Sequence, residues 1–127
     1  MKSLLILIIS LLATSLAQTL LLTDSSHGLI LSNDAGMTLY IFTNDSDGEN
    51  TCYDACASTW PPLLVEALLE LPEGVSGELG LTTRKDGSLQ LTLRGMPLYY
   101  FAGDSQAGDT NGQGLGNAWF VATALED

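Results

Sequence analysis

Short runs of apolar residues alternate with turn-forming residues along most of the chain. Residues 28–31 are followed by Asx and Gly positions, and residues 89–93 are followed by Arg94-Gly95. Runs of this length bounded by Asn, Asp and Gly are typical of strands joined by tight turns. The pattern predicts antiparallel hairpins and a meander, with strands in five stretches: residues 19–22, 28–31, 79–81, 89–93 and 118–122.

A motif of ten residues occurs twice, at residues 36–45 and 95–104. Both copies read Gly-Met-x-Leu-Tyr-x-Phe-x-x-Asp, so six of the ten positions are identical. A repeat of this density indicates a duplicated structural unit, and we expect the two units to span about residues 28–71 and 79–123. The spacing of Leu, Tyr and Phe is expected to place these side chains on one face of a strand.

The segment between the two motif copies has a different pattern. A short helix is predicted to begin after Thr51, to carry both cysteines and to end at Pro61. Residues 63–71 combine apolar bulk with helical propensity before the Pro-Glu-Gly turn at 72–74. We therefore expect an α+β fold in which strands dominate, with two repeated hairpin or meander units and a short helical segment between them.

The N-terminus has the pattern of a cleaved signal peptide over residues 1–17. Lys2 precedes an apolar run, and small residues stand at the positions required before the predicted cleavage site after Ala17. The run is shorter than the ~20 residues that span a bilayer, so no transmembrane segment is expected after cleavage. No cysteine follows the run, so no lipid anchor is predicted. Residues 18–127 then form a single domain, secreted or periplasmic.

Acidic residues dominate the charge of the chain. It has 15 Asp and Glu against four Lys and Arg, which gives a formal net charge of −11. A surface of this sign repels phosphates and gains nothing from counterion release, so nucleic acid is excluded as a partner. The charge either provides solubility and suppresses association, or attracts cations or a basic partner.

The flanks of the motif carry further short patterns over nearly the whole mature chain. These are Cys52-x-x-x-Cys56-Ala57, Trp60-Pro61-Pro62-Leu63, Arg84-x-Asp86-Gly87, Pro97-Leu98-Tyr99 and a Gly-rich stretch from Gly108 to Trp119. Together with the two Tyr-x-Phe-x-x-Asp motifs, they resemble the bacterial secreted-repeat family described as predicted lipoproteins with a Yx(FWY)xxD motif. The resemblance implies little about activity, because the family is described as functionally uncharacterised. The chain departs from lipoprotein members in lacking a lipobox cysteine.

The motif itself supplies the first candidate site residues, which are Tyr40, Phe42, Asp45, Tyr99, Phe101 and Asp104. Aromatic rings on a half-buried sheet face are typical of core or cross-strand packing. A carboxylate at the end of a strand can accept a hydrogen bond from a backbone N–H or a Tyr hydroxyl, which would make the motif a structural lock. Alternatively, the two copies bring their Tyr and Asp side chains together around a shared ligand.

Cys52 and Cys56 are the only cysteines, and export into an oxidising compartment favours a disulfide between them. Alternatively, two thiolates at this spacing can hold Cu(I) in a metal-handling or redox protein. Met37, Met96 and His27 are weak further candidates for such a metal site. The two methionines occupy the same position of the motif, so they equally suit a repeated core position.

Acidic loops follow both copies of the motif, at residues 45–50 and 104–112. Their oxygen side chains and Gly turns suit calcium, although neither completes the twelve-residue calcium loop with its terminal Glu. No cofactor is expected, with copper and calcium as the alternatives. No catalytic residue is assigned, since the chain has one His and no Gly-x-Ser-x-Gly sequence. We expect a non-enzymatic module that binds, or supports structurally, an unknown partner in the envelope or outside the cell.

Overall fold

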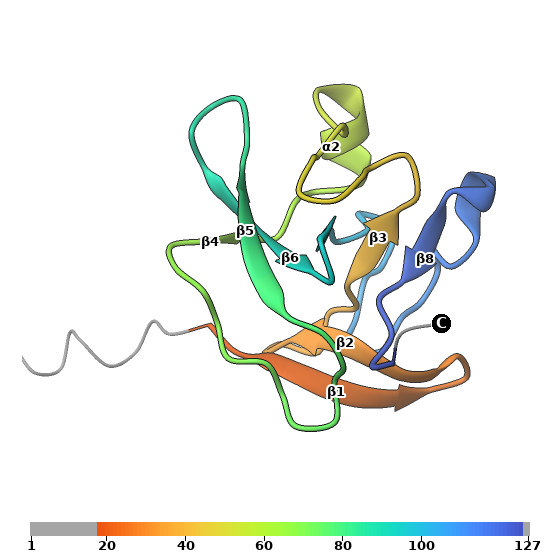
Figure 1. Cartoon of the computed structure of the whole chain (residues 1–127). Helices are drawn as coiled ribbons and strands as arrows, with labels where there is room; N and C mark the ends of the chain where they lie inside the picture. Colours follow the sequence, from red (N-terminus) through yellow and green to blue (C-terminus); the bar gives the residue numbers. More distant parts are fainter. Residues whose placement is uncertain (1–17, 126–127) are drawn as a thin grey trace, which may run out of the picture.

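The computed structural model describes residues 18–125 (Figure 1). The predicted signal peptide lies outside these residues. Strands dominate the described part, and their pairings are antiparallel, as predicted.

The first repeat begins with a β-hairpin. Strand β1 (Leu20–Ser25) pairs with β2 (Gly28–Asn33), so both expected strands are present and both are longer than predicted. The Ser25 hydroxyl donates to the Gly28 carbonyl oxygen (2.8 Å) and accepts from the His27 N–H (2.9 Å). These bonds close the turn, where Gly28 has a φ of +88° that suits glycine.

The second repeat begins with the corresponding hairpin. Strand β5 (Leu79–Thr83) pairs with β6 (Leu89–Leu93) across the predicted Asp-Gly turn. In this turn the Asp86 carboxylate accepts from the N–H and the hydroxyl of Ser88 at 2.9 and 2.6 Å. Strand β6 also pairs with β4 (Leu64–Val65) and with β7 (Met96–Pro97), so it forms the centre of its sheet.

The motif strand of the first repeat lies against the last strand of the chain. Strand β3 (Tyr40–Phe42) pairs with β8 (Trp119–Val121), which is the core of the last predicted strand. Figure 1 shows this pair beside the hairpin of β1 and β2, with the end of β6 near β3 and with β4 and β5 on the other side of the view.

The two repeats exchange the segments at their C-terminal ends. In the first repeat, the Leu31 N–H donates to the carbonyl oxygen of Ala122 in the second repeat (2.9 Å). In the second repeat, the Leu91 N–H donates to the carbonyl oxygen of Leu63 in the first repeat (3.0 Å). Each half of the domain is therefore completed by a strand of the other half.

Helical structure is confined, within residues 18–125, to two short elements. The α-helix α2 (Ala55–Thr59) is shorter than predicted: it begins after Asp54 and not after Thr51, so it carries Cys56 but not Cys52. It ends where the Trp60 N–H donates to the Cys56 carbonyl oxygen (2.8 Å). The 3-10 helix η1 (Leu115–Asn117) precedes β8. The α part of the predicted α+β class is thus limited to short segments, and the fold is strand-dominated.

The predicted helical character of residues 63–71 is wrong. Strand β4 occupies part of this segment, and the remainder has neither helix nor strand structure. Prolines at 62 and 72 bound the segment, and a helix this short gains little from its own hydrogen bonds. Pairing with β6 buries Leu63 and Val65 instead.

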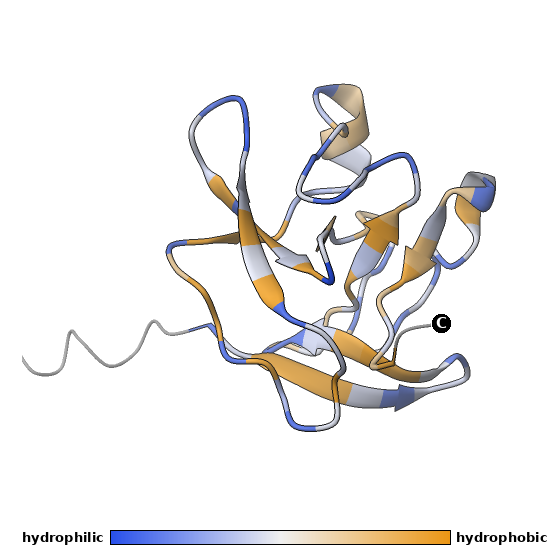
Figure 2. Cartoon of the chain, in the orientation of Figure 1, coloured by the Kyte–Doolittle hydropathy of each residue, from blue (hydrophilic) through white to orange (hydrophobic). Residues whose placement is uncertain are grey.

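Buried side chains form two clusters on opposite sides of the motif strands. One is largely aliphatic and includes Leu39 and Leu98, whereas the other contains Tyr40, Tyr99 and most of the aromatic rings. The expectation that Leu, Tyr and Phe share a face is therefore wrong for Leu, because Leu39 directly precedes Tyr40 and successive residues of a strand point to opposite faces. Figure 2 shows polar residues at the hairpin tips and apolar residues along the strands.

Candidate functional site

The two motif tyrosines lie side by side at the centre of the molecule. The Tyr40 N–H donates to the Tyr99 carbonyl oxygen (2.8 Å), and the Tyr99 N–H donates to the Tyr40 carbonyl oxygen (2.9 Å). Both side chains are fully buried. This reciprocal pair brings the two copies of the motif into direct contact.

The tyrosine hydroxyls bond to the aspartates of the opposite copy. The Tyr40 hydroxyl donates to Asp104 Oδ2 and the Tyr99 hydroxyl donates to Asp45 Oδ2, both at 2.7 Å. The spacing of Tyr and Asp within one copy suggested a lock inside each repeat. The observed bonds run between the repeats.

The second oxygen of each aspartate is also used. Asp45 Oδ1 accepts from the N–H of Thr51 (2.8 Å) and from its hydroxyl (2.6 Å), and Asp104 Oδ1 accepts from the Asn111 N–H (2.9 Å). Each carboxylate therefore holds the loop that follows it as well as the tyrosine of the other repeat. Backbone N–H donors to these strand-end carboxylates are as expected, but nothing in the sequence indicates that Thr51 and Asn111 supply them.

Burial extends the pH range over which the two tyrosines stay protonated. It raises the pKa of Tyr40 and of Tyr99 well above the ordinary value, and the hydrogen bonds to Asp104 and Asp45 raise each further. An ionised phenol would lie next to a carboxylate in a site with little water. Both hydroxyls are therefore protonated donors at neutral pH.

Four aromatic rings form a continuous stack beside the tyrosines. Trp60 and Trp119 stack at a centroid distance of 3.9 Å, Phe42 stacks on Trp119 at 4.0 Å, and Phe101 stacks on Trp60 at 4.4 Å. Each phenylalanine thus contacts the tryptophan of the other repeat. The motif Tyr and Phe side chains and both tryptophans belong to one cluster that joins the repeats.

Trp60 and Trp119 are a part of the repeat that sequence reasoning missed. They follow Tyr40 and Tyr99 at the same spacing, and the spacing was available in the sequence. Their surroundings concealed it, because a Cys pair and Pro-Pro flank one tryptophan and Gly-rich sequence precedes the other.

The cysteines lie at the edge of this cluster and form the predicted disulfide. Cys52 and Cys56 are bonded, and Cys52 is fully buried. Arg84, only 7% exposed, donates to the carbonyl oxygen of Cys52 (2.6 Å) and to Gln90 Oε1 (2.9 Å). Its guanidinium also lies 4.3 Å from the centroid of the Tyr53 ring. The disulfide loop is therefore attached to β6.

The structure does not gather the other candidate metal ligands around the cysteines. His27 is exposed in the β1–β2 turn, and it lines a cavity of about 560 Å³ together with Met96. Both thiols are consumed by the disulfide. Within residues 18–125 there is no group of three or more His, Cys, Asp or Glu side chains that could hold a metal ion.

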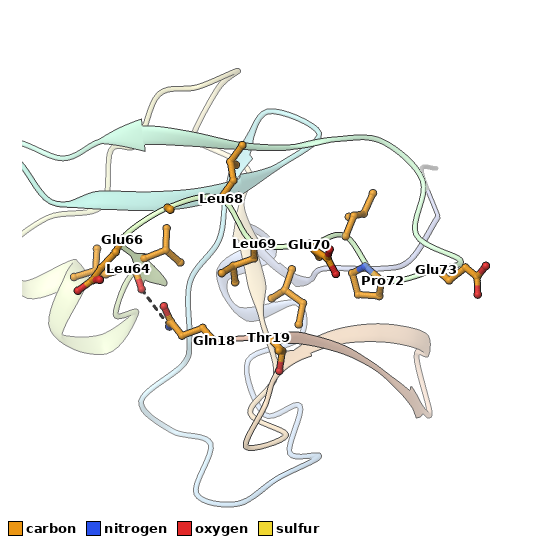
Figure 3. A pocket seen from close by; sticks show the side chains of 13 residues that line it. Gln18, Thr19, Leu64, Glu66, Leu68, Leu69, Glu70, Pro72 and Glu73 are labelled. Carbon is orange, nitrogen blue, oxygen red and sulfur yellow. Dashed lines mark hydrogen bonds between the residues drawn. The ribbon is translucent and has the colours of Figure 1, made fainter. Parts of the chain in front are cut away.

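A larger cavity lies away from the motif. It has a volume of about 950 Å³ and lies between the start of β1 and the segment that follows β4 (Figure 3). We call it the linker groove and define it by residues 18–20 and 64–73. Most of the residues that line it are leucines and glutamates, and none of the motif residues contributes to it.

Comparison with known proteins gives a family but no activity. A family described as a secreted repeat of unknown function matches residues 22–64 and 80–123, more than half of the chain. The match agrees with the resemblance found in the motifs, and the description agrees with the predicted export. No curated protein and no solved structure matches the chain. Within the described residues, no helix has the length and apolar character to cross a membrane.

Proposed function

The chain belongs to this family of secreted repeats, and from that premise we propose that it is an exported, non-enzymatic binding or structural module of the envelope or extracellular space. In this proposal the doubled motif is a structural lock that joins the two repeats. The observation that supports it is the reciprocal pair of bonds from Tyr40 to Asp104 and from Tyr99 to Asp45.

The state of the lock also argues against a shared ligand at the motif. Asp45 and Asp104 are 5% and 8% exposed, and both carboxylates already accept bonds on each oxygen. Within residues 18–125, no buried side-chain nitrogen or oxygen lacks a hydrogen-bond partner. A ligand at this place would have to break hydrogen bonds that hold the fold. Each buried group left without a partner would then add a desolvation cost to the free energy of binding.

The same proposal assigns the cysteines a structural role. The disulfide fixes the loop between the acidic residues and Trp60, next to the buried Arg84. Thiol titration and intact mass of the exported protein should give no free thiol and a mass lower by two hydrogens. Free thiols that bind Cu(I) stoichiometrically would contradict the proposal.

Calcium binding by the acidic loops is tested separately. Asp45 and Asp104 are engaged by protein donors, and Asp109 accepts from the N–H groups of Ser105 and Gln106 at 2.9 and 3.1 Å. We expect no thermal shift at millimolar calcium. A calcium-dependent rise in Tm would contradict a purely structural role of these loops.

The direct test of the proposal uses Tyr99→Phe, which removes one hydroxyl of the lock. We expect a loss of about 1 kcal/mol of unfolding free energy. At a temperature well below its Tm, the variant should retain from an envelope fraction the same proteins as the wild type. A stable Tyr99→Phe protein that loses a partner would show that the motif is a binding site.

A further inference from the structure

We propose that the linker groove binds an extended peptide segment in which apolar and basic side chains alternate. The inference rests on the proposed function, because it requires that binding takes place on the surface and not at the motif. It depends on three features of residues 64–73: unpaired backbone groups, exposed leucines and a row of glutamates.

The backbone of the groove is open for pairing. Within residues 18–125, no hydrogen bond involves the backbone N–H or C=O groups of residues 66–71. This segment continues directly from β4, which is paired with β6. Unpaired groups next to the end of a strand are the condition for addition of an extended peptide by main-chain hydrogen bonds.

The side chains of the groove provide apolar surface. Leu68 is 56% exposed and Leu64 is 43% exposed, whereas Leu69 and Leu71 pack partly against the aliphatic cluster. Figure 3 shows Leu68 and Leu69 on opposite sides of the chain trace, with Gln18 and Thr19 across the groove. An exposed leucine pair beside a cavity can accept the apolar residues of a partner.

Charge decides among the possible occupants. Glu66, Glu70 and Glu73 line the groove and are exposed, and Figure 3 shows Glu66 and Glu73 at its two ends. A second copy of the chain has a net charge of −11 and an anionic lipid surface is also negative, so the glutamates of the groove would repel both. Lys and Arg side chains alternating with apolar ones complement both features of the groove.

The groove also has no counterpart in the second repeat. The family match ends at residue 64 and resumes at residue 80, so residues 65–79 lie outside both matched segments. These residues connect the two halves of the lock, but they are not part of it. Sequence in this region can therefore change without a change in the lock.

The probe for this site is a fluorescein-labelled peptide, Lys-Val-Lys-Leu-Lys-Val with blocked ends, measured by fluorescence anisotropy against the mature protein. The variant replaces the three glutamates, Glu66→Gln, Glu70→Gln and Glu73→Gln. We expect it to bind about tenfold more weakly, since three surface ion pairs at about 0.5 kcal/mol each correspond to that factor.

A matched control removes three charges elsewhere, by Asp24→Asn, Asp34→Asn and Asp54→Asn, all at exposed positions. This control should bind within about threefold of the wild type, because none of the three residues lines the groove. A fourth protein, Leu68→Ser, tests the apolar contact with the charges kept. Loss of binding in this variant is also expected.

The main-chain component is tested with a second peptide, in which alternate residues are N-methylated on the edge that would pair. Its binding should fall about tenfold or more, because it can no longer donate the hydrogen bonds of an added strand. Equal binding of both peptides would contradict strand addition. Equal binding by wild type and the triple Gln variant, or no binding of the probe at all, would overturn the proposal.

The remaining outcomes identify other occupants. A dimer in light scattering that is lost in Leu68→Ser, or binding to vesicles of anionic phospholipid, would contradict a basic peptide as the occupant. Tyr99→Phe separates this inference from the proposed function. If Tyr99→Phe, still folded, loses the probe, the motif is a binding site and the proposed function fails. If the triple Gln variant and Leu68→Ser bind the probe as tightly as the wild type, and Tyr99→Phe also binds it, only the assignment of the groove fails.

Discussion

The centre of the molecule and the linker groove differ most in how their polar groups are satisfied. At the centre, Tyr40 and Tyr99 are fully buried, and their hydroxyls bond to aspartates of the opposite repeat. In the groove, the backbone of residues 66–71 makes no hydrogen bond within the described chain, and Leu68 is more than half exposed. The centre has the features of a fixed interface, and the groove has those of a surface that is open to a partner.

The difference separates the recognisable motif from the place where binding is proposed. Residues that repeat in the sequence hold the two halves together, because the same side chains must meet their counterparts across the pseudo-symmetric centre. Residues between the repeats are free of that requirement. Mutations should therefore affect stability at the centre and leave it nearly unchanged in the groove.

The largest effect is expected from Trp119→Ala. Trp119 stacks on Trp60 and Phe42 and contacts the Tyr99 ring edge-on at 5.1 Å. Truncation should cost about 4 kcal/mol of unfolding free energy, measured by urea denaturation, since it removes a large buried ring from a packed cluster. The control Leu68→Ala should change stability by less than about 0.5 kcal/mol. Similar losses in both variants would contradict the comparison.

The next effect is expected from loss of an aspartate of the lock. Asp45→Ala leaves three donors without their acceptor, and Asp104→Ala leaves two. We expect losses of about 3 and about 2 kcal/mol, because each change leaves a buried tyrosine hydroxyl without its acceptor and also removes the bonds that hold the following loop. The exposed Asp24→Ala is the control. Unchanged stability in both lock variants would show that the bonds contribute nothing.

A smaller effect is expected from Gly112→Ala. A Cβ at this position would lie 2.7 Å from the Trp60 ring and 3.0 Å from the Tyr40 ring, and rigid rings can yield little. The loss should be about 2 kcal/mol, with a change in the near-UV circular dichroism of the aromatic stack. The control is Gly114→Ala, where an added Cβ would meet no neighbouring atom but φ is +79°. This variant should lose stability through backbone strain without the change in the near-UV spectrum. An unaltered spectrum in Gly112→Ala would contradict tight packing here.

The lock also predicts a loss of stability at alkaline pH. Burial, with the bonds to Asp104 and Asp45, raises the folded-state pKa of Tyr40 and Tyr99 above the ordinary value of 10.0. The folded state therefore keeps protons that the unfolded chain releases above about pH 10, so stability is intact below that pH and falls as the pH rises. At one pH unit above 10, the loss of unfolding free energy should be about 1 kcal/mol for each tyrosine. The double variant Tyr40→Phe and Tyr99→Phe should have a flatter dependence, and an equal slope would contradict the assignment.

The sequence predicts the local elements better than the way they combine. The hairpins of β1–β2 and β5–β6 follow from apolar runs and Asx-Gly turns, and the disulfide follows from two cysteines in an exported chain. The exchange of Ala122 and Leu63 between the repeats could not be predicted, because pairing of distant strands leaves no local periodicity. For the same reason the Tyr–Asp bonds were expected within each copy and are found between copies.

Residues 63–71 illustrate how tertiary structure overrides propensity. Leu, Ala and Glu favour a helix there, but β4 pairs with β6 and buries Val65 in the aliphatic cluster. For Trp60 and Trp119, in contrast, the sequence does carry the signal, because each tryptophan follows its motif tyrosine by the same number of residues. Comparison of spacing beyond the matching residues would have assigned both tryptophans to the repeat.

The central claim is that the repeats are joined by bonds between them, and a double-mutant cycle tests it most directly. The cycle of Tyr99→Phe with Asp45→Ala should give a coupling energy of about 1–2 kcal/mol, because these side chains are hydrogen-bonded. The cycle of Tyr40→Phe with Asp45→Ala joins residues of one motif copy and should give less than about 0.5 kcal/mol. A larger coupling within the copy than between the copies would contradict the account.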